Sequence, residues 1–181
     1  IMENPEIIEE ALIALSEKRT AEEAALALAA IADNQDALIN NPADYSIGPA
    51  DAQVTVIEFF DYRCGFCKRS AAWATELPEQ YDNKVRVAFK EFPILSTESE
   101  KAALAAIAAG KQDKYLEMHM ALMELDNGSG FGPEQIDAAA ESVGVDVEKM
   151  RADMKSIEVQ KTVADAKSLA RSLNITGTPN F

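Results

Sequence analysis

The sequence predicts an α/β fold in which a strand, a helix and a second strand are followed by a long helical stretch and preceded by a helical arm. Two apolar runs, 52–60 and 84–92, are rich in β-branched and aromatic residues and are typical of strands buried on both faces. The segment between them has helical spacing. A strand, helix, strand order makes the two strands parallel neighbours.

The arm, residues 1–42, has no glycine or aromatic residue before position 40. We expect two helix starts in it, one where Asn4 precedes Pro5 and one at a capping box from Thr20 to Glu23. The arm must bury an apolar stripe either on the rest of the chain or in a homo-oligomer, and both alternatives stay open. The stripe consists of Ile7, Ile8, Ala11, Leu12, Leu15, Leu28, Ile31, Leu38 and Ile39.

The helix between the strands should run from Cys64 to about Tyr81, with Pro78 kinking or ending it. The residues after the second strand are helical in pattern. A capping box from Thr97 to Glu100 opens this stretch, and further helices are expected near 113–125, 133–143, 146–154 and 157–173, with a loop at 127–130. The expected helix stops are Gly110, Gly144 and Asn174.

Composition and charge exclude several classes of function. The 181 residues are 48% hydrophobic and carry a formal net charge of -14, which repels nucleic acid and anionic lipid. The longest apolar stretch, Ala24 to Ala32, is far shorter than the roughly 18 residues of a membrane span. Because the chain opens on Ile1, we expect that it has been trimmed, either by a signal peptidase or when the protein was prepared.

Cys64 and Cys67 are the only cysteines, too few for a disulfide framework, so a bond between them should serve chemistry. Cys64 lies where the strand passes into the helix, and the free N–H groups of a helix start stabilise a thiolate there. Cys67 is one turn deeper on the same face, and Gly65 leaves the approach uncrowded. This arrangement suits a reversible disulfide.

Two other interpretations of the pair are weaker. A zinc site needs four ligands, and the chain offers only His119 besides the two cysteines, so we expect no metal. A pair of buried structural thiols is the other interpretation, because free cysteine behaves as a small apolar residue. The alternative function is therefore a binding or chaperone module whose cysteine pair is incidental or holds metal.

The stretches "VIEFFDYRCGFCK", "VRVAFKEFPIL" and "ITGTPNF" resemble the DsbA family of thiol:disulfide oxidoreductases over residues 51–181. The resemblance implies a thioredoxin-like fold, formed by 43–95 and 156–181, with an α-helical domain inserted at 96–155. It also implies that the natural protein continues beyond Phe181 with two strands and a helix. The arm resembles the ScsC-like subgroup, some members of which oligomerise through such an arm.

By this resemblance the chain exchanges disulfides with unfolded or misfolded extracytoplasmic proteins, in the periplasm, and a membrane redox partner resets the pair. Cys64 would be the nucleophile, Cys67 the resolving cysteine and Pro179 a cis-proline packed against them. No cofactor beyond the cysteines is implied. Whether the chain acts as oxidase, isomerase or reductase stays open, because that depends on a reduction potential.

Further residues take expected roles from the same resemblance. Thr178 should offer backbone hydrogen bonds to an extended substrate, and Phe66 and Gly65 between the cysteines are expected substrate contacts. Two other residues receive ordinary structural interpretations. Trp73 is expected in the core, and His119 at the surface or at a domain interface.

Glu58, six residues before Cys64, matches the family's buried acid beneath the active site. It would move protons to and from Cys67, since a carboxylate inside an apolar strand needs a function or a partner. Lys90 on the neighbouring strand is its expected partner.

Overall fold

The computed structural model describes residues 6–128 and 131–181; the expected helix start at Asn4 and Pro5 and part of the expected loop at 127–130 lie outside them. A three-stranded sheet lies at the centre, in the order β1 (Ser46–Ile47), β3 (Val85–Glu91), β2 (Val54–Phe60). Strands β2 and β3 are parallel, as predicted, and β1 is antiparallel to β3. Helix α3 (Gly65–Gln80) connects the parallel strands, so the predicted strand, helix, strand unit is confirmed.

Pro78 lies in the last turn of α3, which ends at Gln80. Asp82 and Asn83 then adopt positive φ angles of 50° and 59° and turn the chain toward β3. The proline therefore acts near the end of the helix, because its missing N–H and its ring oppose further helical turns.

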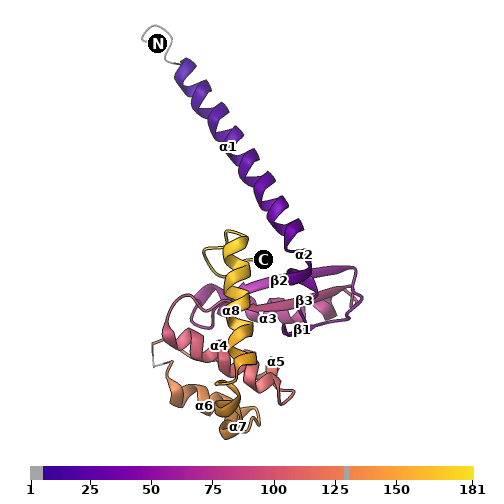
Figure 1. Ribbon diagram of the computed structural model, residues 1–181, viewed down its shortest axis with the longest axis vertical. Helices are drawn as coiled ribbons and strands as arrows, with labels where there is room; N and C mark the ends of the chain where they lie inside the picture. The colour runs from indigo at the N-terminus through magenta and orange to yellow at the C-terminus, as the bar shows by residue number, and fades with distance from the viewer. Residues whose placement is uncertain (1–5, 129–130) are drawn as a thin grey trace.

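Among the described residues, five helices follow β3. They are α4 (Thr97–Gly110), α5 (Tyr115–Glu124), α6 (Pro133–Ser142), α7 (Val147–Asp153) and α8 (Ile157–Ser172). Figure 1 shows α4 to α7 gathered on one side of the sheet, with α8 running alongside α4 and back to the strands. The helices lie where the sequence predicted them within two residues at each end.

The starts and stops of these helices differ in detail from the prediction. Helix α4 is capped by Ser96, whose Oγ accepts the N–H of Ser99, so the expected capping box from Thr97 is wrong by one residue. Gly144 and Asn174 end their helices with φ angles of 78° and 55°. Gly110 is instead the last residue of α4, where a Cβ would lie 2.0 Å from the Tyr45 ring.

Strand β3 and the last residues of β2 are buried, but Val54 is exposed and Thr55–Ile57 are half-buried, so the prediction of two strands buried on both faces holds for β3 and only for the end of β2. The larger core joins the sheet to α3, α4, α5 and α6, and there the Phe60 ring meets those of Tyr62 and Phe89 edge to face. A smaller core on the other face consists of Leu38, Phe59, Phe92, Leu169 and Ala170.

The arm forms one long helix, α1 (Glu6–Asp33), and a short one, α2 (Gln35–Ile39). The predicted helix start at Thr20 is wrong, since Thr20 Oγ1 donates to the carbonyl of Ser16 in the middle of α1. Helix α1 extends away from the sheet in Figure 1, and none of its residues is buried. No helix in the described parts of the chain combines the length and the apolar character needed to cross a bilayer.

Candidate active site

The turn between β2 and α3 is organised by Asp61, whose side chain is almost completely buried. Its Oδ1 accepts the N–H of Arg63 at 2.8 Å, and its Oδ2 accepts the N–H groups of Ile94 and Leu95 at 2.8 and 2.9 Å. Its carbonyl accepts the N–H of Cys64 at 3.0 Å. Asp61 was not among the residues predicted from the sequence. Its position could have indicated this role, because an aspartate at a turn often accepts a hydrogen bond from the backbone N–H two residues later, here that of Arg63.

Cys64 is the N-cap of α3, as predicted, and its Sγ accepts the N–H of Cys67 at 3.4 Å. The thiol also donates to the carbonyl of Thr178 at 3.2 Å. Burial alone would raise the pKa of Cys64, but hydrogen bonds from the side chain of Thr178 and from the N–H groups of Cys67 and Phe66 outweigh it. The pKa of Cys64 is therefore lowered, as expected for a sulfur at a helix start.

Cys67 has the opposite environment. Its side chain is fully buried, and burial raises its pKa to about 12, with the neighbouring Cys64 adding to the rise. Both cysteines are free thiols in the structure. The pair thus consists of one sulfur whose pKa is lowered and one whose pKa is raised.

Glu58 lies in β2 and is 1% exposed. Burial raises its pKa to about 7, and the hydroxyl of Ser70, which donates to its Oε1 at 3.3 Å, only partly opposes this. The same hydroxyl lies 3.1 Å from the carbonyl oxygen of Cys67, so Ser70 connects the acid to the backbone of the turn that carries Cys67. Ser70 was not predicted from the sequence, because its contact with Glu58 depends on how α3 packs on the sheet.

Lys90 is not the partner of Glu58, and that expectation is wrong. In the parallel register Lys90 is opposite Phe59, and Glu58 is opposite Phe89. Because side chains alternate along a strand, Lys90 and Glu58 point to opposite faces of the sheet. Lys90 instead forms a buried ion pair with Asp44 and donates to the carbonyl of Ala37 at 2.6 Å.

The loop after α8 completes the site. The bond between Thr178 and Pro179 is cis, as the family resemblance implied. Asn180 exchanges two backbone hydrogen bonds with Phe59 of β2, at 2.9 and 3.0 Å. This pairing ties the loop to the strand that carries Glu58 and brings the Thr178 carbonyl to the sulfur of Cys64.

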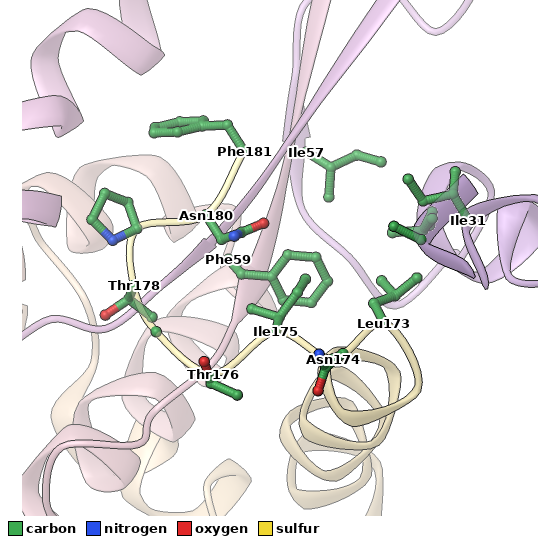
Figure 2. Close-up of a pocket in the computed structure, with 14 residues that line it drawn as sticks. Ile31, Ile57, Phe59, Leu173, Asn174, Ile175, Thr176, Thr178, Asn180 and Phe181 are labelled. Carbon is green, nitrogen blue, oxygen red and sulfur yellow. The ribbon is translucent and has the colours of Figure 1, made fainter. Parts of the chain in front are cut away.

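A groove of about 530 Å³ adjoins this loop on the side away from α3. Figure 2 shows Phe181, Asn180 and Thr178 along one wall, and Ile57 and Ile31 toward the arm. Phe59, Leu173 and Ile175 contribute apolar side chains to the groove (Figure 2). An extended apolar segment would fit its chemistry, next to the loop that contacts Cys64.

Phe66 is 67% exposed beside the cysteines, with the guanidinium of Arg69 4.3 Å from its ring centroid. Gly65 opens α3, and a Cβ there would meet only the Arg69 side chain, at 3.7 Å. Trp73, expected in the core, is 46% exposed and packs edge to face on Phe181, so that expectation is wrong. The residue lies on the exposed part of α3, next to the loop that pairs with β2.

His119 is fully buried, so its expected place at the surface is wrong and the alternative, an interface, holds. It lies between α5 and the sheet, with Nδ1 3.1 Å from the hydroxyl of Tyr62. Burial lowers its pKa to about 3.

Tyr62 and Tyr115 both donate to Oε1 of the buried Glu91, at 2.9 Å each. Within the described residues, no three His, Cys, Asp or Glu side chains gather as metal ligands.

Comparison with known proteins places these features in context. The pattern of the DSBA-like thioredoxin domain matches residues 55–181. A probable disulfide bond formation protein D of Bacillus anthracis is 30% identical over 149 residues, which cover 75% of this chain and 67% of that protein. The chain also matches Na(+)/H(+) antiporter NhaA 1 of Salinispora arenicola, with 29% identity, but spans only 21% of its length.

Two solved structures extend the likeness. A thioredoxin-like oxidoreductase from Silicibacter pomeroyi DSS-3 superposes with a TM-score of 0.76 and 38% identity, covering 81% of this chain and 83% of that one. A linker-deletion mutant of Proteus mirabilis ScsC superposes with a TM-score of 0.78 and 30% identity, covering 98% and 82%. The match to ScsC therefore includes the arm.

Proposed function

Since the chain belongs to the family of DSBA-like thioredoxin domains, we propose that it exchanges disulfides with cysteine-bearing proteins through Cys64 and Cys67. The observation that carries the proposal is the contrast between the two thiols. The pKa of Cys64 is lowered at the start of α3, and the pKa of the buried Cys67 is raised to about 12. A thiol pair of this kind has one attacking or leaving sulfur and one resolving sulfur.

In the oxidising direction, a substrate thiolate attacks Sγ of Cys64 in the Cys64–Cys67 disulfide. A bond forms between the substrate and Cys64, and the bond between the two cysteines breaks with its electron pair passing to Cys67. A second substrate thiolate then attacks the substrate sulfur of the mixed disulfide and releases the Cys64 thiolate. The substrate loses two electrons and the cysteine pair gains them. Reduction follows the same steps in reverse.

Glu58 supplies or accepts the proton that Cys67 needs in these steps. A carboxyl group with a pKa of about 7 exists in both forms near neutral pH, which suits a proton carrier. The hydroxyl of Ser70 donates to Oε1 of Glu58 and lies within reach of the Cys67 carbonyl, so it fixes the acid beside the turn that carries Cys67 without itself contacting the sulfur.

Substrate contacts are proposed for the residues around the exposed side of Cys64. Phe66 offers an exposed apolar ring, and Gly65 leaves room for a chain to approach. The loop at Thr178 and Pro179 runs antiparallel to β2 beside Cys64, where an extended substrate could add alongside it. No cofactor other than the cysteine pair is required.

The wider setting is also part of the proposal. One solved relative is a periplasmic thioredoxin-like protein from Salmonella enterica serovar Typhimurium, with 26% identity and a TM-score of 0.66. We place the chain in the same kind of compartment, where unfolded or misfolded proteins are substrates and a membrane partner resets the pair. Exposed leucines and isoleucines along α1 make it the segment through which copies would associate.

A trapping experiment tests the proposal against a module with an incidental cysteine pair. The variant Cys67→Ser, mixed with an unfolded protein that contains a disulfide, should accumulate a covalent adduct at Cys64, because no resolving sulfur remains. Cys64→Ser should form little adduct, since Cys67 is buried and holds its proton. Adducts in neither variant, or equally in both, would reject the assignment.

A further inference from the structure

Lys68, the residue after Cys67, is bound by a segment far away in the sequence. Its ammonium group has three donors, and three backbone carbonyls at the carboxyl end of α5 surround it. The distances from Nζ are 3.4 Å to Leu122, 3.0 Å to Met123 and 2.6 Å to Leu125. The last carbonyls of a helix lack partners within it and form the negative end of its dipole, so a lysine there is stabilising.

Asn127, in the chain that follows α5, makes a second contact on the other side of the cysteine pair. Its Nδ2 donates to the carbonyl of Arg63 at 2.7 Å. Arg63 immediately precedes Cys64, just as Lys68 immediately follows Cys67. The carboxyl end of α5 and the residues after it therefore hold the chain at both ends of the Cys64–Cys67 segment.

Apart from the contacts of Asp61 with the turn before it, the first turn of α3 has little apolar burial to hold it. Gly65, Phe66 and Arg69 are exposed, and only Cys67 among the first residues of the helix is fully buried. The orientation of this turn matters, because the N–H of Cys67 must point at Sγ of Cys64, 3.4 Å away. A turn with so little apolar burial depends on its polar contacts for its orientation.

We propose that Lys68 and Asn127 are positioning residues for thiol-disulfide exchange, which hold the first turn of α3 so that its N–H groups face Cys64 and the pair becomes more oxidising. The inference rests on the function proposed above and extends it to residues outside the cysteine pair. It makes the carboxyl end of α5 a part of the redox site.

The physical reason is the difference between the two redox states. The reduced state contains a Cys64 thiolate, which the N–H groups of the first turn stabilise, and the disulfide state carries no such charge. A turn that is free to rotate loses part of this stabilisation. The reduced state then becomes less favourable, and the equilibrium with glutathione shifts toward the protein disulfide.

The ammonium charge of Lys68 could stabilise the thiolate without any positioning, so the test separates charge from contact. Lys68→Met removes both, Lys68→Arg keeps the charge and the donors, and Asn127→Ala removes a contact without changing any charge. The readouts are the equilibrium constant between the protein disulfide and reduced glutathione, and the titration of the Cys64 thiolate by its ultraviolet absorbance. Neither readout changes merely because a folded variant is less stable.

The expected result is that Lys68→Met and Asn127→Ala each shift the glutathione equilibrium roughly two- to tenfold toward the protein disulfide, the factor equivalent to the net free energy of one hydrogen bond. Both should also raise the pKa at which Cys64 titrates, and Lys68→Arg should lie close to the unchanged protein. The matched control is Lys111→Met, which removes a lysine paired with Asp153 and Glu158 far from the cysteines and should shift neither readout.

An unchanged equilibrium and titration in folded Asn127→Ala would overturn the inference. So would a shift confined to Lys68→Met with Asn127→Ala normal, because that result would mean that charge alone acts. If the unchanged protein does not react with glutathione at all, the proposed function fails. The thiolate titrations of the same variants still decide the positioning role in that case.

Discussion

The substitution Glu58→Gln tests the buried acid through both stability and chemistry. The pKa of Glu58 is raised from 4.5 to about 7, mainly by burial. Between these two values the folded state keeps a proton that the unfolded state has already lost. Each pH unit in that window therefore lowers the free energy of unfolding by about 1.4 kcal/mol.

The sum over the window from pH 4.5 to about 7 is about 3 kcal/mol. The full stabilisation is present below pH 4.5, is lost progressively as the pH rises, and is gone above the folded pKa. Glutamine cannot ionise, so the variant lacks this part of the pH dependence. Its amide oxygen can still accept the hydroxyl of Ser70, which preserves the neighbouring hydrogen bond.

The assay is urea unfolding of both reduced proteins near pH 4.5 and near pH 8. Taking the difference between the two pH values for each protein cancels any cost of the amide that does not depend on pH. The wild type should lose about 3 kcal/mol more than Glu58→Gln over this range. In turnover, the variant should be slow in the step that deprotonates Cys67. Equal pH dependence of both stability and turnover in the two proteins would refute the reasoning.

Three further predictions concern reactivity, a buried ion pair and the arm. Cys64 should alkylate at least about 30-fold faster than Cys67 at mildly acidic pH, since its much larger thiolate fraction is only partly offset by weaker nucleophilicity; equal rates measured by mass spectrometry would contradict this. Lys90→Met should destabilise the protein by about 3–5 kcal/mol in urea unfolding, because Asp44 is left buried without its partner. Adding Asp44→Leu should recover part of that loss, and no recovery would show that the charge of Asp44 is not the cause. A chain beginning at Asn34 keeps α2 and its buried Leu38 but lacks α1, and it should have the mass of a monomer in solution where the longer chain is an oligomer; equal association in both would exclude the arm as the interface.

The features that could be predicted from sequence are those that depend on neighbouring residues. The strand, turn and helix around Cys64 follow from an apolar run, a polar turn and helical spacing within about 30 residues. The place of Cys64 at the helix start, and with it the direction of its pKa, came from the same local pattern. Pro179 was found through a family motif, which carries information that local patterns do not.

The features that the sequence analysis predicted wrongly depend on register and packing between distant segments. Lys90 was assigned to Glu58 because the strands are neighbours, but the register of β2 and β3 sends the two side chains to opposite faces. His119 has the sequence surroundings of a surface residue, but α5 packs it against the sheet. Thr20 matches a capping box, yet helix propensity carries one helix through it.

The contacts of Lys68 could not be predicted for the same reason. Its partners are backbone carbonyls more than 50 positions away. Every residue has a backbone carbonyl, so the residue types in the sequence do not show which of them Lys68 contacts.

The redox equilibrium of Cys64 and Cys67 with glutathione tests the central claim most directly. Samples equilibrated across a range of glutathione ratios would be quenched by alkylation and weighed by mass spectrometry. The account predicts one reversible two-electron transition, with any glutathione adduct on Cys64 and a potential above the roughly −300 mV below which structural disulfides lie. A pair that remains reduced at every ratio, or an adduct found on Cys67, would contradict it.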